Sequence, residues 1–357
     1  MKQRLFVTLG LAGLAMATFG ATKPKAAIKS LNKTTIQQPT YTEWHDLQVN
    51  AINRFPLHTN FFTYPADDWV SEKDGKIVSK NILHMNKTES KYFLSLDGTW
   101  KFNWVANADQ RPTDFYKEDL DDSNWKTMNV PGNWEMNGFG DPEYVNNGFA
   151  WREHFNEQPP AVPTKDNHVG SYRRIIDIPA NWDGKQVVAH FGSVTSNIYL
   201  YVNGKFAGYA EDSKVAAEFD ITPYLKKGKN LIAFQTFRWC DGSWDEDQDF
   251  WRLSGVARES YLFARDAKLH LEDIRVTPDL VNNYKDGVLN ISTKVKGNGK
   301  LVFTLFDKDG KQVATTTGVA KNGTANFSLQ VANPQKWSAE TPYLYTLQVS
   351  LMGAQKK

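Results

Sequence analysis

Residues 244–251 read WDEDQDFW and place an aspartate at every second position between two tryptophans. On a β-strand, Asp245, Asp247 and Asp249 would share one face, because successive side chains of a strand point to opposite faces. Neighbouring carboxyl groups of this kind can supply the acid and the nucleophile that hydrolyse a glycosidic bond. A solvated loop is the simpler interpretation of Asp245 and Glu246, so a strand of catalytic aspartates is the weaker hypothesis.

The same stretch does not fit a calcium-binding loop. If Asp245 were the first ligand, Phe250 would stand where an EF-hand needs glycine, and Val256 where it needs a bidentate glutamate. The single cysteine, Cys240, excludes a disulfide framework and a cysteine-based zinc site, and we expect it to be a small buried residue. No HExxH motif occurs, and the histidines without metal-ligand spacing include His45, His154 and His168. We therefore expect no cofactor to be held by this chain alone.

Tryptophans cluster in and beside this stretch, and a planar indole can stack on the apolar face of a sugar ring. In a β-sandwich a tryptophan more often belongs to the core, which we expect for Trp100, Trp104 and Trp239. Trp244 lies in a predicted loop and is the better candidate to face a ligand. Arg252 is expected to hold the loop through a buried carboxylate rather than to touch substrate. The other tryptophans of the cluster are Trp134, Trp151 and Trp251.

The elements that position these side chains are predicted to be strands, because short aromatic and β-branched runs recur between turn residues. Asn203-Gly204 predicts a two-residue hairpin, and residues 223–230 predict a turn. No amphipathic helix longer than about two turns is evident. The pattern predicts an all-β sandwich or jelly roll that closes near Arg265. Its clearest strand candidates are 98–104, 171–178, 197–202, 206–209 and 231–239.

A second region begins at Lys268 and predicts an immunoglobulin-like β-sandwich. Asp309-Gly310 and Asn322-Gly323 are hairpin signals between its strands. Residues 353–357 read as a turn with no returning strand, so we expect the chain to be cut short. The strand candidates are 269–277, 287–295, 299–307, 312–317, 324–331 and 343–351.

The amino-terminal residues 1–22 predict a signal peptide. A short basic start precedes an apolar run from Leu5 to Leu14, and Ala15-Met16-Ala17 supplies the small residues that signal peptidase requires. A buried first helix is the alternative. The polar residues 23–42 predict a flexible leader, and the mature protein is expected to be exported, to the periplasm or the extracellular space.

Composition excludes several classes of protein. The chain has 357 residues, a formal net charge of +2 and 41% hydrophobic residues. These values are ordinary for a globular protein and give no electrostatic footprint for nucleic acid. After the predicted signal peptide, no stretch reaches the roughly eighteen apolar residues of a membrane span. We therefore expect neither nucleic acid nor a membrane as a partner of the mature protein.

Longer strings resemble glycoside hydrolase family 2, and specifically its β-galactosidase branch. Residues 191–259, which end in DGSWDEDQDFWRLSGVARE, resemble the family's amino-terminal sugar-binding jelly roll. LDGTW at 96–100, VPGNWEMNGFGDP at 130–142 and PPAVPTKDNHVGSYRR at 159–174 agree in order. The resemblance implies a sugar-binding jelly roll over 43–266, followed by an immunoglobulin-like domain over 267–357 that is incomplete.

Enzymes of this family cleave terminal β-D-galactosyl residues with retention, using two glutamates on a (β/α)8 barrel. That barrel would follow the immunoglobulin-like domain, so the resemblance implies a non-catalytic portion that completes the rim of an active site. Asp249 matches the family aspartate that contacts sugar hydroxyls and helps to hold a monovalent cation. Gln158 holds a place where the family commonly has asparagine, and Asn156 stands two residues earlier, so both are further candidates to bind the sugar.

The resemblance also implies partners and cofactors. The monovalent cation and Mg²⁺ would belong to the complete enzyme. The expected partners are a β-galactoside or related glycan, the missing barrel or another subunit, and a second copy in a homo-oligomer. A stand-alone carbohydrate-binding protein without hydrolase activity is the main alternative, and β-glucuronidase and β-mannosidase are sister activities.

Overall fold

The computed structural model describes residues 38–353, apart from 74–75, 80–82, 84, 147, 150, 152–154 and 247–248. The predicted signal peptide and most of the predicted leader lie outside the described residues, as do His154 and Asp247. None of the helices in the described part of the chain has the length and hydropathy needed to cross a bilayer. The one α-helix described is α1 (Ala66–Trp69), as the absence of helical periodicity predicts.

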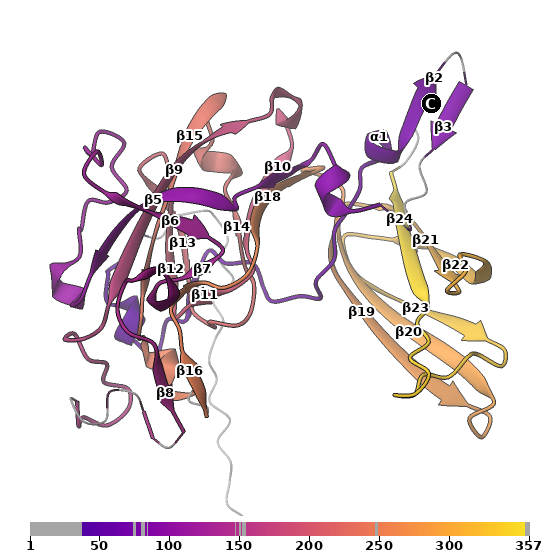
Figure 1. The fold of residues 1–357 in the computed structure, drawn as a ribbon. Helices are drawn as coiled ribbons and strands as arrows, with labels where there is room; N and C mark the ends of the chain where they lie inside the picture. Colours follow the sequence, from indigo (N-terminus) through magenta and orange to yellow (C-terminus); the bar gives the residue numbers. More distant parts are fainter. Residues whose placement is uncertain are drawn as a thin grey trace, which may run out of the picture. The chain divides into compact units, whose positions relative to one another are not determined.

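The first domain is a sandwich of two antiparallel sheets (Figure 1). The larger sheet has the order β1 (Ala51–Ile52), β13 (Lys205–Ala210), β12 (Ile198–Val202), β15 (Gly228–Phe237), β9 (Val169–Ile178), β5 (Gly98–Val105) and β6 (Lys126–Val130). The smaller sheet has the order β14 (Ala217–Asp220), β10 (Gln186–Phe191), β18 (Ser260–Arg265) and β4 (Phe93–Ser95). The predicted all-β jelly-roll class is confirmed.

Aromatic side chains fill the space between the two sheets. Phe191 on β10 contacts Phe234 on β15, with ring centroids 5.3 Å apart, and Tyr172 on β9 stacks on Phe234 at 4.3 Å. The other face of the larger sheet is also covered, by a second cluster that contains Tyr199 and Tyr201. Every residue of β12 is consequently buried, because both faces of the strand are packed.

Local signals predicted this sandwich well. The Asn203-Gly204 hairpin is present: Val202 pairs with Lys205, and both turn residues have positive φ, 49° and 73°. This is the geometry that the right-handed twist of two adjoining strands favours. Trp100 and Trp239 are buried as predicted. Trp104 is only half-buried, so its assignment to the core holds in part.

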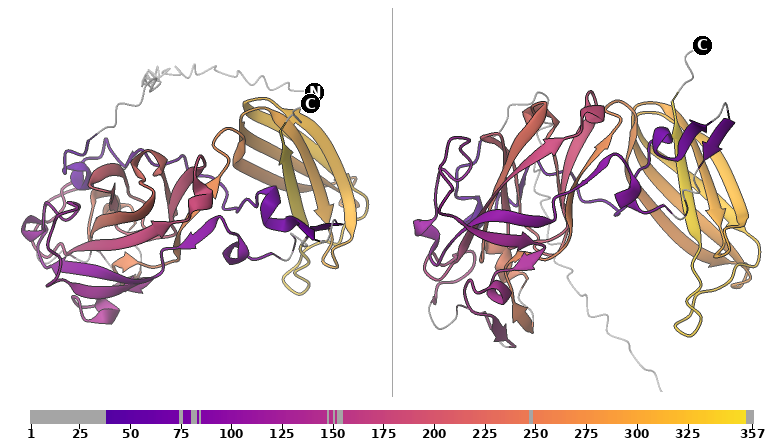
Figure 2. Two further views of the ribbon diagram at one scale, coloured as in Figure 1. Left: turned by 90° about the horizontal axis from the view of Figure 1, so that it is seen from above. Right: turned by 45° about the horizontal axis from the view of Figure 1, so that its top comes forward.

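The second domain contains the six predicted strands as two facing three-stranded sheets (Figures 1 and 2). Phe303 and Phe327 meet between the sheets with ring centroids 4.6 Å apart. Most strands match the predicted ranges within a few residues, but β19 runs four residues further, to Val281. One sheet has the order β19 (His270–Val281), β20 (Asp286–Lys296) and β23 (Gly323–Val331); the other has the order β22 (Gln312–Ala320), β21 (Gly299–Phe306) and β24 (Thr346–Met352).

Short elements complete the described part of the chain, and the sequence did not predict them because segments of two to four residues leave no periodic signal. The short strands are β2 (Val70–Lys73), β3 (Lys76–Ser79), β7 (Gly132–Asn133), β8 (Glu143–Val145), β11 (Val194–Thr195), β16 (Phe250–Arg252) and β17 (Gly255–Val256). The 3-10 helices are η1 (Glu43–His45), η3 (Lys87–Glu89), η4 (Ala108–Gln110), η5 (Glu135–Asn137), η6 (Ala180–Trp182), η7 (Thr222–Tyr224) and η8 (Asp241–Trp244).

Candidate functional site

Asp249 directly precedes β16, which pairs with β8 in a two-stranded ribbon that we call the aromatic ribbon. The strands are antiparallel, and Trp251 pairs with Tyr144. Both aromatic side chains are about half exposed, 52% for Trp251 and 54% for Tyr144. Their rings contact edge to face, with centroids 5.6 Å apart. Two aromatic surfaces and an exposed carboxylate therefore lie together.

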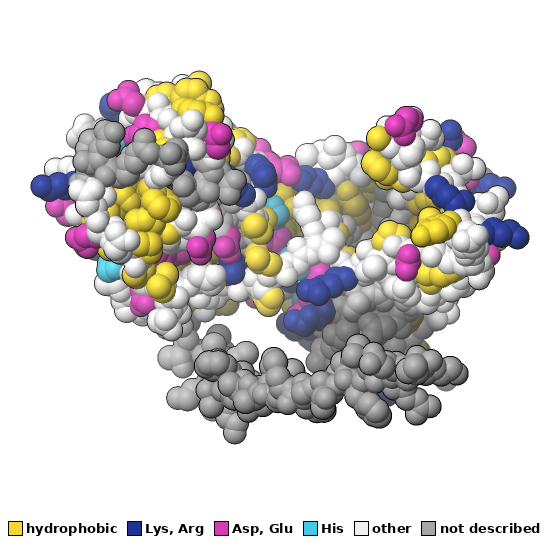
Figure 3. Space-filling model, turned by 90° about the horizontal axis from the view of Figure 1, so that it is seen from below, with side chains coloured by type: hydrophobic (Ala, Val, Ile, Leu, Met, Phe, Trp, Pro, Cys, Tyr) yellow, Lys and Arg dark blue, Asp and Glu magenta, His cyan; other side chains and the backbone are white. Residues whose placement is uncertain are grey.

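The carboxylate of Asp249 is oriented by its neighbour, because the Tyr144 hydroxyl donates a hydrogen bond to Asp249 Oδ1. This hydrogen bond raises the pKa of Tyr144, since ionisation would place two negative charges side by side. Figure 3 looks onto the end of the jelly roll where β8 and β16 lie, and hydrophobic side chains gather there. A carboxylate that accepts hydroxyl hydrogen bonds beside aromatic faces is suited to a sugar.

The weaker hypothesis, a strand of aspartates, is wrong, and the favoured interpretation of Asp245 and Glu246 as loop residues agrees with the structure, which has a turn there. Residues 241–244 form the 3-10 helix η8 and Asp245 lies in the turn that follows. A 3-10 helix followed by a turn does not alternate side chains between two faces, so Asp245 and Asp249 do not share a strand. Of the two, Asp249 alone directly precedes a strand, and that strand carries Trp251.

Trp244 is held mainly by the protein itself. Its indole nitrogen donates to the Ala161 carbonyl oxygen at 2.9 Å. Its ring packs edge to face on Phe149 and Trp151, with centroids 4.2 and 5.1 Å away. Trp244 thus lies at the margin of a buried aromatic cluster, and its predicted contact with a ligand stays a prediction.

Gln158 and Asn156 are both exposed and lie just before the Pro159-Pro160 turn. The main-chain oxygen of Gln158 accepts a hydrogen bond from Ala161 at 3.1 Å, which fixes the turn. Among the residues that the structure describes, no hydrogen bond or ring contact joins either side chain to Asp249. Their predicted role in sugar binding therefore stays a prediction.

A small cavity of about 40 Å³ lies beside the aromatic ribbon, with Phe250 and Trp251 in its wall. The Lys214 ammonium lies 5.5 Å from the centre of the Phe250 ring, and burial lowers the pKa of this lysine. Ser213 Oγ and Arg238 Nε are buried without a hydrogen-bond partner in the described part of the chain, and both residues line the cavity. The cavity has room for a few water molecules to satisfy these atoms, but not for a sugar ring.

A second polar cluster, which sequence reasoning missed, contains Glu211, Cys240 and Asp241. One potential ligand atom from each lies within 4.8 Å of the others, and all three residues are buried. Cys240 is buried as predicted. Thirty positions separate Glu211 from Asp241, so no local spacing in the sequence predicts the cluster.

Burial gives this cluster unusual acid–base properties. Burial, followed by the charge of Asp241, raises the pKa of Glu211 to about 8, against the hydrogen bond that Tyr209 donates to its Oε1. Burial also raises the pKa of Asp241. Two carboxyl groups at this separation can share a proton or bind a cation, and their hard oxygen atoms suit Mg²⁺ or Ca²⁺.

Comparisons with known proteins agree with the architecture. Residues 93–266 match the sequence model described as glycosyl hydrolases family 2, sugar binding domain, and residues 269–357 match the one described as glycosyl hydrolases family 2. A β-galactosidase of Priestia megaterium is 36% identical over 327 residues, which are 88% of this chain and 30% of the relative. A β-galactosidase large subunit of Leuconostoc lactis is 33% identical over 87% of this chain and 49% of its own length.

Solved structures share the fold at lower identity. A glycosyl hydrolase family 2 member of Bacteroides cellulosilyticus is 23% identical, with a TM-score of 0.55 over 74% of this chain and 35% of that chain. A β-glucuronidase of Bifidobacterium dentium is 18% identical, with a TM-score of 0.57 over 73% of this chain and 45% of that chain. The chain spans less than a third of the length of the first curated β-galactosidases that it matches. Because the two sequence matches cover 93–357 apart from 267–268, the chain belongs to glycosyl hydrolases family 2 and carries its sugar-binding domain and the domain that follows.

Proposed function

We propose that this chain is the non-catalytic amino-terminal portion of a β-galactosidase that hydrolyses terminal β-D-galactosyl residues. The aromatic ribbon carries the proposal, because it presents an oriented carboxylate and two aromatic surfaces on an exposed edge. It would form part of the rim of the active site, and the rest of the enzyme would supply the remainder. The relatives named β-galactosidase support this activity at 36% identity.

The chemistry of the described carboxyl groups supports a non-catalytic role. Retaining hydrolysis needs two carboxyl groups about 5 Å apart that flank the glycosidic oxygen. Glu211 and Asp241 are close enough, but their residues are only 7% and 4% exposed, so a glycosidic oxygen cannot reach them. Asp249 is exposed but faces a tyrosine hydroxyl rather than a second carboxyl group.

In the proposed site Asp249 accepts hydrogen bonds from galactosyl hydroxyls, while the hydrogen bond from Tyr144 orients the carboxylate. Trp251 offers its exposed face to the apolar side of the sugar ring. Asp249 would also give one hard oxygen atom to a monovalent cation, whose other ligands would come from the barrel. Export follows as a further part of the proposal from the signal-like residues 1–22.

A chimera tests this proposal. The chain replaces the matching amino-terminal part of the Priestia megaterium relative, and hydrolysis of a nitrophenyl β-galactoside is measured. We expect activity in the chimera, at least a hundredfold loss of kcat/KM in Asp249→Ala (about 2.7 kcal/mol), and no loss in Asp245→Ala, a matched exposed aspartate. Full activity of Asp249→Ala would refute the proposed role of Asp249 in the rim of the active site.

A stand-alone carbohydrate-binding protein is the second candidate, and the exposure of Tyr144 and Trp251 favours it. Calorimetric titration of the isolated chain with galactosides separates the two. Saturable millimolar binding that Trp251→Ala abolishes would support the binding protein. Binding only in the chimera would support the enzyme portion.

A further inference from the structure

Residues 53–62, which we call the strap, join the two sandwiches. The strap begins beside β14, where Arg54 forms a β-bridge with Phe219 and the Phe55 amide donates to the Glu218 carbonyl oxygen at 2.8 Å. Near its other end Phe61 packs against the core of the second sandwich. The Thr59 amide donates to Asp273 Oδ1 on β19 at 3.1 Å.

His58, at the middle of the strap, faces a hydrogen-bond acceptor with each ring nitrogen. Its Nε2 lies 2.9 Å from Glu218 Oε2, and its Nδ1 lies 2.8 Å from the Thr59 carbonyl oxygen. Neither a carboxylate nor a carbonyl can donate, so both contacts are satisfied only when the imidazole carries two protons. The geometry therefore selects the imidazolium form of His58.

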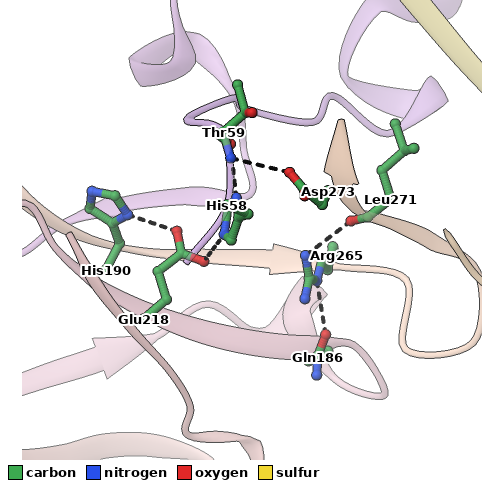
Figure 4. A network of polar contacts seen from close by, with 8 residues as sticks. All are labelled: His58, Thr59, Gln186, His190, Glu218, Arg265, Leu271 and Asp273. Carbon is green, nitrogen blue, oxygen red and sulfur yellow. Dashed lines mark hydrogen bonds and ion pairs between the residues drawn. The ribbon is translucent and has the colours of Figure 1, made fainter. Parts of the chain in front are cut away.

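Glu218 is clamped between two histidines (Figure 4). It pairs directly with His190 across β14 and β10, and His190 Nδ1 lies 2.8 Å from Glu218 Oε1. Tyr261, the partner of His190 on β18, stacks on the His190 ring at 4.3 Å. Burial alone would raise the pKa of Glu218, but the hydrogen bonds from His190 and His58 overcome it and lower this pKa to about 2. The carboxylate thus stays charged at every pH at which His58 titrates.

The charges around His58 favour its protonated form. The hydrogen bond to Glu218 is the strongest cause of its raised pKa, and the charge of Asp273 adds to it. Arg265, at the end of β18, ties the same junction in another way: its guanidinium donates to the Leu271 carbonyl oxygen at 3.2 Å and lies 5.6 Å from the centre of the Phe55 ring. Arg265 stays charged near neutral pH, so this contact does not depend on pH. Further acidic groups at the junction include Asp220 on β14, Asp266 directly after β18 and Glu272 on β19.

We propose that His58 is a pH-sensitive fastener, which holds the strap to β14 while it is protonated and releases that contact as the imidazolium loses its proton. A histidine whose pKa is raised by folding stabilises the folded state fully below its ordinary value of about 6.5, and this contribution is lost as pH rises through the raised value. The strap then loosens around His58, while Arg265 still ties the first sandwich to Leu271 of the second and Phe62 still packs on Tyr261 and Phe263 of β18. The proposal does not depend on the sugar-binding role of the aromatic ribbon.

Hydrogen exchange of the full chain, followed by mass spectrometry, tests the fastener. Protection of strap amides, corrected for the intrinsic exchange rate, is compared at about pH 5.5 and about pH 8.5, on either side of the ordinary histidine pKa. We expect protection to fall about tenfold at the higher pH, the size of effect expected for the loss of one hydrogen bond to a charged group. His58→Gln should remove this pH dependence, and His45→Gln, at an exposed histidine outside the strap, should keep it.

A second measurement keeps the test decisive if His58→Gln does not fold. Histidine titration by NMR should give His58 a pKa above 6.5, and Glu218→Gln should lower it toward or below that value. Strap protection that is independent of pH in the unmodified chain would overturn the proposal. Equal pH dependence in the unmodified chain and in His58→Gln would overturn it as well.

Discussion

Tyr144 donates a hydrogen bond to the Asp249 carboxylate, although 105 positions separate the two residues. The contact joins the first strand of the aromatic ribbon to the residue that precedes the second. A carboxylate on an exposed loop has several rotamers, and one fixed donor selects among them. The tyrosine therefore acts as a positioning residue for the aspartate that the resemblance to the family singles out.

Tyr144→Phe tests that relationship. The substitution removes the hydroxyl and keeps the ring, so Trp251 retains its aromatic neighbour. In the chimera we expect KM for a nitrophenyl galactoside to rise about fivefold, the equivalent of about 1 kcal/mol for one hydrogen bond. Tyr284→Phe is the control, because Tyr284 is 70% exposed in the second sandwich. An unchanged KM in Tyr144→Phe would show that Asp249 is oriented without it.

A substitution at Gly170 on β9 tests the packing of the core between the two sheets of the first sandwich. A Cβ atom at this position would overlap the Trp134 ring and approach Phe102 Cε2 to 2.8 Å. Gly170→Ala should therefore lower the free energy of unfolding by about 1–3 kcal/mol, the usual cost of overpacking a core. Thr127→Ala on the exposed face of β6 should change it by less than about 0.5 kcal/mol. Urea unfolding compares the two variants, and equal midpoints would contradict the described packing.

Local patterns in the sequence predicted the parts of the fold that depend on neighbours in the chain. The β12–β13 hairpin follows from Asn203-Gly204 alone, and the strands of the second sandwich follow from alternation. The contacts that build the site and the strap are of another kind. Tyr144 and Asp249 are 105 positions apart, and His58 and Glu218 are 160. Such pairings leave no periodic signal, so they became visible only when the sheets brought the residues together.

The buried pair Glu211 and Asp241 predicts an unusual dependence of stability on pH. Between 4.5, the ordinary pKa of a glutamate, and about 8, the folded state holds a proton that the unfolded state has lost. The free energy of unfolding should therefore fall as pH rises through this window. Glu211→Gln stays neutral and should flatten the fall, whereas Glu340→Gln, at an exposed glutamate, should not. Thermal unfolding measured across this pH range checks the prediction. Parallel profiles of Tm against pH for Glu211→Gln and the unmodified chain would contradict the raised pKa of Glu211.

A divalent cation bound at Glu211 and Asp241 should replace the proton that Glu211 holds in the folded state. Mg²⁺ or Ca²⁺ needs ionised carboxylates, so binding at Glu211 and Asp241 should be tighter above pH 8 than below pH 6. At a hundredfold excess over Kd, the Tm should rise by about 5 °C, and a chelator should reverse the rise. Asp241→Asn should abolish the effect, and Asp245→Asn, four residues away and exposed, should preserve it. A rise in Tm that persists in Asp241→Asn would place the cation elsewhere. No rise at any pH would leave the two carboxyl groups as a pair that shares a proton.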